Sequence, residues 1–435
     1  MPLVLTLLAI LCLIILILWI KLDTFISFIL VSIGLGLISN LKIETITKAI
    51  QSGVGGTLGE LTLIIGFGAM LGKMVAVSGA AHKITTKLIS VFGEKYLLWG
   101  LALAGFIIGI PLFYNAGFVI VVPLIFSIAA TTRLPILYLA IPMLSALSVA
   151  HGYLPPHPSP AAIASLLHAN LGKTLMYGIL VAIPAIAIAG PIFGKTLKKY
   201  KPTINTNLFT DQEVPEAEQP SLFRSMFVAL LPVVLLTVMS FIKPYFLDNK
   251  FIQLFAEPYI GMLVSVLVAV YLLGVKQGKT IGQCSKLLEE SFKGVAPILL
   301  IIAGSGALKQ IFIESGTSEY VGEILIQSNL NLLFLGWAIA AFIRVCIGSA
   351  TIAGLTAVNI LLPLIQSQTG TSPELMVLAI GAGSLMFSHI NDGGFWLFKE
   401  YFNLSINDTL KTWSVMETLV SVVGLVGVLI LQFFI

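Results

Sequence analysis

Two polar segments interrupt apolar sequence and contain the side chains most able to do chemistry. The first, His151-Gly-Tyr-Leu-Pro-Pro-His157, contributes two imidazoles. The second, His389-Ile-Asn-Asp-Gly-Gly394, contributes an imidazole, an amide and a carboxyl group. Polar groups and irregular backbone persist at membrane depth only where protein or a water-filled cavity satisfies them. A matched pair of interrupted spans is typical of the binding site of a secondary transporter.

The composition indicates an all-α, polytopic membrane protein. Of 435 residues, 57% are hydrophobic and 10% are charged, against about 25% charged in an average soluble domain. The formal net charge of +4 is modest and the basic residues are dispersed in short loops, so we expect no nucleic-acid partner. Cys12, Cys284 and Cys346 are too scattered for a disulfide framework or a metal cluster, and no cofactor is expected.

Apolar runs of about 20 residues are long enough to cross the hydrocarbon core. The first half has continuous predicted spans near 3–20, 24–39, 59–78 and 174–194, and the second half near 223–243, 258–275, 295–313 and 411–435. One interrupted span in each half, about 134–168 and about 373–402, contains a polar segment. The run Leu3–Ile20 has no basic region before it and no clear cleavage site, so we expect a retained span rather than a signal peptide.

Each half also contains two apolar stretches that are too short to cross. Residues 97–110 and 116–130 flank Pro111–Asn115, and residues 331–346 and 353–366 flank Ile347–Thr351. At ~1.5 Å per residue, a stretch of roughly 15 residues reaches only ~22 Å, short of the ~30 Å core. A re-entrant hairpin in each half is the economical interpretation, and two short tilted spans are the alternative.

An internal repeat at an offset of 238 residues supports this division. The offset pairs Lys48 with Lys286, Gly66 with Gly304, Pro135 with Pro373, His151 with His389, and Thr174 with Thr412. Each half then has five crossings and a hairpin, and because five is odd the two halves must be inverted repeats. The predicted units are residues 1–194, a hydrophilic linker 195–222, and residues 223–435. Most Lys and Arg residues fall on the linker's side, which predicts a cytoplasmic linker and both termini outside.

Several segments resemble the gluconate permease (gluconate:proton symporter) family. His151-Gly-Tyr-Leu-Pro-Pro-His-Pro158 resembles its HGxxPPHP signature, and Arg344–Thr351, Asn391–Trp396 and Leu410–Glu417 are similar to other family segments. The resemblance implies a carrier of gluconate or a related hydroxy acid in the bacterial inner membrane. It also implies membership of the broader ion-transporter superfamily, with a homodimer whose transport domains move like elevators.

One position departs from the family pattern. Where the first hairpin of the family is expected to have an acidic residue, this chain has Asn115. A neutral amide neither carries a proton nor repels a carboxylate. The departure leaves open which hydroxy acid is carried and what couples its transport.

An anionic hydroxy acid requires a partner for its carboxylate and hydrogen bonds for its hydroxyl groups. Helix N-termini provide free N–H groups and about half a positive charge, and helices are predicted to start after Asn115, Pro160, Thr351 and Gly394. The predicted neutral ligands are Asn115, Ser159, Ser349, Thr351 and Asn391. The alternative for the hydroxyl-bearing residues is helix capping alone.

Arg344, Asp392 and the histidines are the candidate charged or titratable groups. The guanidinium of Arg344 could grip a carboxylate through two hydrogen bonds, or pair with Asp392. Asp392 is the candidate to carry the coupled proton, because burial disfavours its ionised form whereas a nearby arginine favours it. The alternative is that Asp392 only caps a helix. His151, His157 and His389 are candidate substrate ligands, with packing in the core as the alternative.

Our prediction is a proton-coupled symporter for gluconate or a similar hydroxycarboxylate. A sodium-coupled carrier or a passive channel for organic anions is the alternative. An intramembrane enzyme is less favoured, because the sequence has no Gly-x-Ser-x-Gly elbow and no His-Glu-x-x-His helix.

Overall fold

The computed structural model describes residues 2–110, 114–155, 157–200, 202, 214–215, 218–246, 248–316, 331–367 and 371–435. Within these residues the regular elements are helices and there is no strand, so the prediction of an all-α protein is confirmed. Six helical runs in the described part of the chain are long and apolar enough to cross a membrane: Ile43–Val77, Ile136–Tyr153, Leu171–Lys199, Tyr259–Gln277, Ile281–Glu314 and Ile406–Leu431. The chain is therefore a multi-pass membrane protein.

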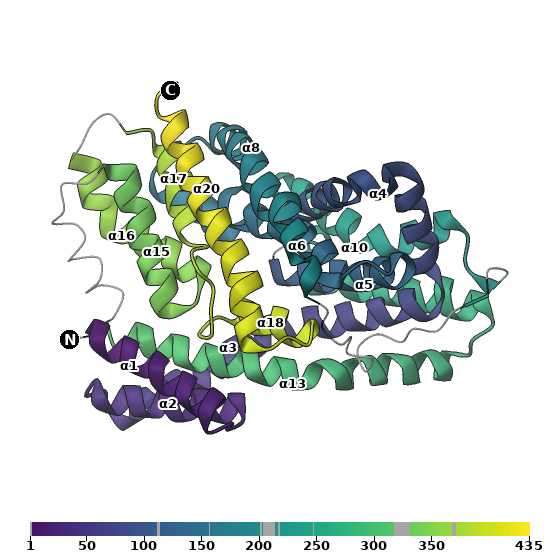
Figure 1. Ribbon diagram of the computed structural model, residues 1–435, viewed down its shortest axis with the longest axis horizontal. Coiled ribbons are helices and arrows are strands. Elements are labelled where there is room, and N and C mark those ends of the chain that lie inside the picture. The colour runs from purple at the N-terminus through teal and green to yellow at the C-terminus, as the bar shows by residue number, and fades with distance from the viewer. Residues whose placement is uncertain are drawn as a thin grey trace.

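Two long helices, α3 (Ile43–Val77) and α13 (Ile281–Glu314), pack side by side along one edge of the molecule (Figure 1). A side chain at Gly53 would collide with the carbonyl group of Gly306, and one at Gly306 would collide with Thr57. Glycine at both positions therefore allows the two backbones to meet. α1 (Pro2–Ile14) and α2 (Thr24–Ile38) lie beside one end of this pair.

Both long helices begin well before the predicted spans 59–78 and 295–313. The predictions counted only the apolar part, whereas the first turns of α3 are polar and exposed, with an ion pair of 2.6 Å between Lys48 and Glu44. At ~1.5 Å per residue, the 35 residues of α3 extend over roughly 52 Å. This length exceeds the ~30 Å hydrocarbon core, so part of the helix lies outside the core or the helix is strongly tilted.

The remaining helices form two groups above this edge. One group contains α15 (Leu332–Ile347), α16 (Ala350–Ser367), α17 (Pro373–Gly383) and α20 (Val415–Leu431) (Figure 1). The other contains α4 (Ala80–Gly109), α5 (Tyr114–Thr132) and α6 (Ile136–Tyr153). α8 (Leu171–Ala187) packs against α6, α17 and α20 and so joins the two groups.

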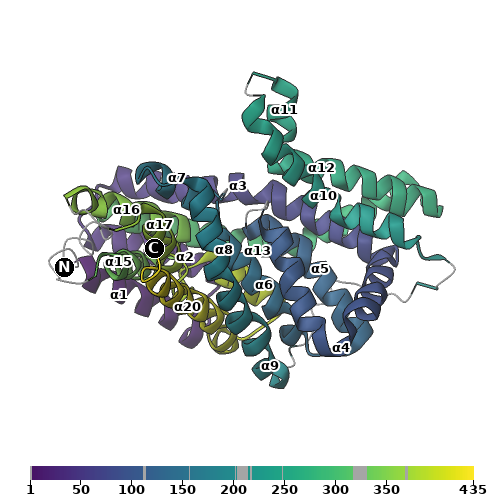
Figure 2. The same ribbon diagram turned by 90° about the horizontal axis from the view of Figure 1, so that it is seen from above.

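The helices around the linker lie at the periphery. α9 (Phe193–Thr196) continues the run of α8, and a short 3-10 turn ends this run at Lys199, inside the predicted linker. α10 (Leu222–Ile242), α11 (Lys250–Phe255) and α12 (Pro258–Ala269) form a group from which α11 projects (Figure 2). Residues 203–213, which make up much of the predicted linker, lie outside the described residues.

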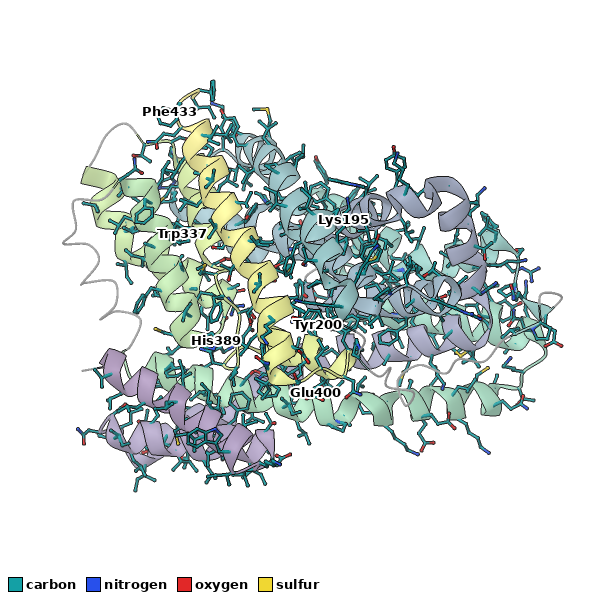
Figure 3. All side chains as sticks on the ribbon, in the orientation of Figure 1. Lys195, Tyr200, Trp337, His389, Glu400 and Phe433 are labelled. Atoms are coloured by element: carbon teal, nitrogen blue, oxygen red, sulfur yellow. The ribbon has the colours of Figure 1, made fainter. Side chains whose placement is uncertain are left out.

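Two short helices follow the polar segments. α7 (Pro158–Leu166) packs against α16 and α17, and α18 (Gly393–Tyr401) packs against α13. α19 (Ile406–Thr409) then leads through a π-helical turn, Leu410–Ser414, into α20. His389 and Glu400 lie near the end of α20 that faces α3 and α13, whereas Phe433 lies at its opposite end (Figure 3). The second polar segment therefore lies where α20, α15 and α13 approach one another.

Candidate functional site

The second polar segment is the non-helical chain between α17 and α18. α17 ends at Gly383, and Asp392 is the N-cap of α18, accepting a hydrogen bond from the backbone N–H of Gly394 at 3.0 Å. The indole Nε1 of Trp396 donates to the carbonyl of Ile390 at 2.6 Å. These local bonds satisfy backbone groups that a continuous helix would have satisfied itself.

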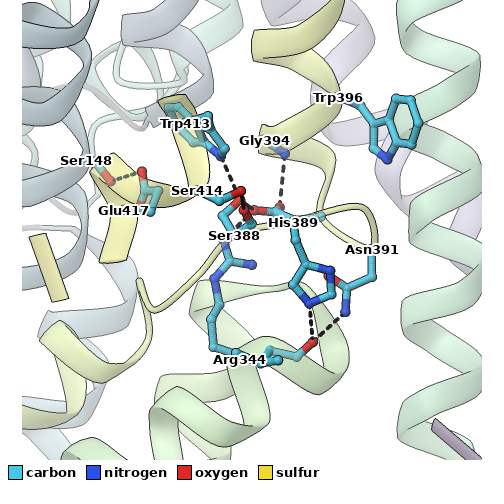
Figure 4. Close-up of polar contacts among 12 residues, drawn as sticks. Ser148, Arg344, Ser388, His389, Asn391, Gly394, Trp396, Trp413, Ser414 and Glu417 are labelled. Carbon is cyan, nitrogen blue, oxygen red and sulfur yellow. Dashed lines mark hydrogen bonds and ion pairs between the residues drawn. The ribbon is translucent and has the colours of Figure 1, made fainter. Parts of the chain in front are cut away.

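Asp392 is also the carboxylate of a buried ion pair. Nη2 of Arg344, near the end of α15, donates to its Oδ2, and the side chain of Arg344 is 5% exposed (Figure 4). The hydroxyl of Ser388 donates to the same Oδ2 and accepts from Nε1 of Trp413 at 2.8 Å. A buried charge is tolerated when it is both paired and hydrogen-bonded, and here the carboxylate has three donors.

The turn between α15 and α16 is attached to the second polar segment. Nδ2 of Asn391 donates to the carbonyl groups of Val345 and Cys346 at 2.8 and 2.9 Å, and Nε2 of His389 donates to that of Val345 at 2.9 Å (Figure 4). Gly348 has φ +75°, and a side chain there would collide with the carbonyl of Asn391. Glycine is required at this position by both the backbone conformation and the close approach.

Fewer residues separate the two helices at the first polar segment, which contains no Asp, Glu, Lys or Arg. α6 continues through His151 to Tyr153, and α7 starts at Pro158. Nε2 of His157 donates to the carbonyl of Gly109 at the end of α4 at 2.8 Å, and the rings of His151 and His157 meet edge to face with centroids 5.4 Å apart. This segment is therefore attached to the end of α4, much as the second segment is attached to the end of α15.

A cavity of about 400 Å³ lies between these segments. The predicted site residues that line it are Asn115, His151, Arg344, Ser349, Thr351, Asn391 and Asp392. The first residues of α5, α16 and α18 also line it, so three helix N-termini bring free N–H groups and positive partial charge to one space. The predicted starts of these helices lie within two residues of the observed ones.

Three of the predicted ligands do not line the cavity. His157 and His389 each bond to a backbone carbonyl, as described above. Ser159 is buried on α7 against Gly354 of α16. Their assignment as substrate ligands stays a prediction, and their contacts in the structure hold segments of the protein together.

Several buried polar atoms of the cavity-lining residues have no hydrogen-bond partner. They are Nε and Nη1 of Arg344, Oδ1 of Asn391, Nδ1 of His151, Oη of Tyr114 and Oε2 of Glu417. Unpartnered buried polar atoms are rare in proteins and are costly. Their concentration around one cavity indicates a site that is completed by a polar ligand. Arg344 in particular keeps two donors after its bond to Asp392.

Sequence reasoning missed part of this lining. Ser148 lies within an apolar run just before the first polar segment, and Tyr114 lies in the break Pro111–Asn115 beside the predicted ligand Asn115. Trp413 and Glu417 lie in the C-terminal segment that carried the family resemblance. Glu417 could have been found as a lone carboxyl group in an otherwise apolar span. Lys309 also lines the cavity.

Comparison with known proteins decides the family. A model described as "GntP family permease" matches residues 1–434. The chain belongs to the GntP permease family. This GntP permease is 44% identical to the high-affinity gluconate transporter of Escherichia coli, over 99% of each chain. It is 41% identical to the Gnt-II system L-idonate transporter of the same organism, over 99% of this chain and 98% of the relative. It is 42% identical to the gluconate permease of Bacillus subtilis, over 99% of each.

Among solved structures, the YdaH transporter of Alcanivorax borkumensis matches this GntP permease with a TM-score of 0.44 and 17% identity, over 94% of this chain and 96% of that one. A likeness at this level carries no argument about the site. The family and the named relatives support a transporter of hydroxycarboxylates.

Proposed function

We propose that this GntP permease takes up gluconate or a closely related hydroxycarboxylate across the bacterial inner membrane, together with protons. The observation that carries the proposal is Arg344, which lines a cavity among three helix N-termini and has two buried guanidinium nitrogens without a partner. A planar guanidinium and a carboxylate form parallel hydrogen bonds. The names of the relatives at 41–44% identity support the same class of substrate.

The remaining lining residues fit a polyhydroxy chain. Asn115, His151, Ser349, Thr351 and Asn391 offer neutral donors and acceptors around the cavity. Hydroxyl groups both donate and accept, so they can pair with each of these side chains. We assign His157, Ser159 and His389 to the same site as residues that support the polar segments and act on the substrate through them.

Asp392 is the proposed carrier of the coupled proton. In the structure Arg344 is its counter-ion. An incoming substrate carboxylate competes for the same guanidinium, and a carboxylate that loses its counter-ion in a buried site gains from binding a proton. Substrate and proton would thereby enter the cavity together, which is the requirement for symport.

The proposed architecture is two inverted repeats with a re-entrant hairpin in each, moving as an elevator within a homodimer. Helix positions support the repeat: α3 starts at Ile43 and α13 at Ile281, 238 residues later, and α2 starts at Thr24 and α12 at Pro258. The helix pairs α4–α5 and α15–α16 correspond to the two hairpins. The proposed units are residues 1–194 and 223–435 with a cytoplasmic linker, 195–222, and both termini outside.

The test is uptake of labelled gluconate by proteoliposomes under an imposed proton gradient, sodium gradient or no gradient. Accumulation driven by the proton gradient, and abolished by an uncoupler, supports the proposal. Accumulation that follows only the sodium gradient identifies a sodium-coupled carrier, and equilibration without accumulation identifies a passive channel. Either result contradicts proton symport.

A further inference from the structure

Glu417, in the first turn of α20, is the second carboxyl group of the cavity. Its residue is 2% exposed, and its Oε1 accepts a hydrogen bond of 2.6 Å from the hydroxyl of Ser148 on α6 (Figure 4). Oε2 is buried and has no partner. None of the ion pairs found among the described residues includes Glu417. The carboxyl group thus has one neutral donor, and its second oxygen is buried without a partner in a residue that lines the cavity.

Tyr114 provides a complementary polar group. Its phenolic Oη is buried without a partner and its residue lines the same cavity. The ring of Tyr114 is close to two other rings, with centroid distances of 5.8 Å to Trp413 and 6.3 Å to His151. Trp413 is about one helical turn from Glu417, and His151 is one turn from Ser148, so the ring of Tyr114 packs against a near neighbour of each member of the Glu417–Ser148 pair.

The carboxyl group of Glu417 and the phenol of Tyr114 together determine which substrate group can bind to both. An ionised carboxylate only accepts hydrogen bonds, whereas a phenol can donate one. An alcohol hydroxyl can donate to Glu417 and accept from Tyr114 at the same time. A substrate carboxylate cannot donate, and it would bring a second negative charge to a carboxyl group that has no ion-pair partner. With Glu417 ionised, a hydroxyl is accommodated as it stands, whereas a carboxylate would require Glu417 first to bind a proton.

We propose that Glu417, held by Ser148 and aided by Tyr114, binds a hydroxyl of the substrate and excludes substrates with a second carboxylate. Arg344 binds the carboxylate of the substrate, and Glu417 binds one of its hydroxyl groups. The inference rests on the proposed function and adds the rule by which the cavity selects sugar monoacids over sugar diacids. It combines an attractive contact for one ligand class with a repulsive contact for the other.

The experiment is competition against labelled gluconate uptake by the full-length protein in proteoliposomes. The competitors are unlabelled D-gluconate and D-glucarate, the corresponding six-carbon diacid, and the quantity is the ratio of their inhibition constants. The wild-type protein is expected to favour gluconate by roughly 100-fold or more, since a site built for a substrate hydroxyl discriminates strongly. Glu417→Gln keeps the side-chain size but gives it an N–H donor, and should reduce this ratio by about 10-fold or more.

Two further variants control the experiment. Glu44→Gln removes an exposed carboxylate that is paired with Lys48 on the surface of α3, and should leave the ratio unchanged. Ser148→Ala keeps the carboxyl group of Glu417 but removes the hydrogen bond that holds it, and should reduce the ratio several-fold. This second variant carries the test if Glu417→Gln fails to accumulate in the membrane.

Each outcome has one meaning. A ratio in Glu417→Gln or Ser148→Ala equal to that of active wild-type protein overturns the inference, as does a wild-type protein that binds glucarate as well as gluconate. A wild-type protein that takes up no gluconate under any gradient contradicts the proposed function instead. A reduced ratio in both variants, with Glu44→Gln unchanged, supports Glu417 as the selecting residue.

Discussion

The two polar segments occupy corresponding places along the chain but differ in charge and in local structure. The first, between α6 and α7, is short and holds its place through a neutral bond from His157 to the carbonyl of Gly109. The second, between α17 and α18, is longer and contains the ion pair of Asp392 with Arg344. Both are attached to the end of another helix, α4 or α15, but only the second segment contains a carboxylate.

The difference indicates that the two polar segments have different roles in the same cavity. The second segment, with Arg344 of α15 beside it, is suited to bind an anion and a proton, whereas the first segment contributes shape and hydrogen bonds. A symmetric pair of charged segments would place additional charges in a space of about 400 Å³, where each would need its own partner. Substitutions in the second segment should therefore affect transport and its coupling, and those in the first should affect mainly rate and stability.

The largest effect is expected for Asp392→Asn. The amide cannot release a proton, so accumulation driven by a proton gradient should be abolished while gluconate exchange across the membrane continues. Proteoliposome uptake and counterflow measure the two activities separately. Uphill transport that persists in this variant would assign the coupled proton to another group.

The same variant gives a second readout that does not depend on transport. Removing the carboxylate leaves Arg344 buried without a counter-ion, which typically costs about 3–5 kcal/mol. Bound gluconate would supply the missing negative charge. Gluconate should therefore raise the thermal unfolding temperature of the purified variant more than that of wild-type protein, and an equal or smaller rise would argue against a substrate carboxylate at Arg344.

Gly348→Ala should be the next most harmful change. The side chain would collide with the carbonyl of Asn391 and would also strain a backbone of φ +75°, so the turn and the second polar segment must separate. We expect uptake to fall at least 10-fold, as the polar contacts of Asn391 with Val345 and Cys346 are disturbed.

Gly278→Ala is the matched control for that change. Gly278 has φ +87°, but a side chain there would meet open space. It should lose about 1–2 kcal/mol of stability from backbone strain and retain normal uptake. Equal losses of uptake in both variants would mean that strain, rather than contact with the second polar segment, explains the effect of Gly348→Ala.

The smallest effect is expected in the first segment, for His157→Gln. The substitution weakens the bond to the carbonyl of Gly109 and should cost about 1–3 kcal/mol of stability, as for a buried acceptor that loses its donor. Initial uptake rates should fall by a few-fold, and the final accumulation ratio under a proton gradient should be unchanged. A lost accumulation ratio would show that the first segment takes part in coupling and would remove the proposed difference between the roles of the two segments.

The sequence predicts the parts of this arrangement that depend on local pattern. Apolar runs located the helices, and proline, glycine and polar residues located the two interruptions and the starts of α5, α16 and α18. The starts of α3 and α13 could not be predicted from apolar runs, because their first turns are polar and exposed. Such turns depend on helix propensity and on the solvent outside the membrane rather than on hydrophobicity.

Tertiary contacts explain the rest. Sequence spacing left open whether Arg344 pairs with Asp392 or faces a ligand, and the structure shows that it has a bond to Asp392 and two donors left over. Ser148 and Glu417 are 269 residues apart, so no local pattern predicts their hydrogen bond. Conversely, the imidazole of His389 was predicted as a ligand from its position, yet the structure places it against a backbone carbonyl.

The central claim is that the free donors of Arg344 bind the substrate carboxylate, and equilibrium binding of labelled gluconate to purified protein tests it most directly. Arg344→Lys keeps the positive charge but removes the planar pair of donors, so binding should weaken by about 10-fold or more, since a charge-assisted hydrogen bond contributes roughly 1.5–3 kcal/mol. Arg133→Lys, a change outside the cavity lining, is the control and should bind gluconate as the wild type does. Normal gluconate binding by a folded Arg344→Lys protein would contradict the account and leave the carboxylate to the helix N-termini alone.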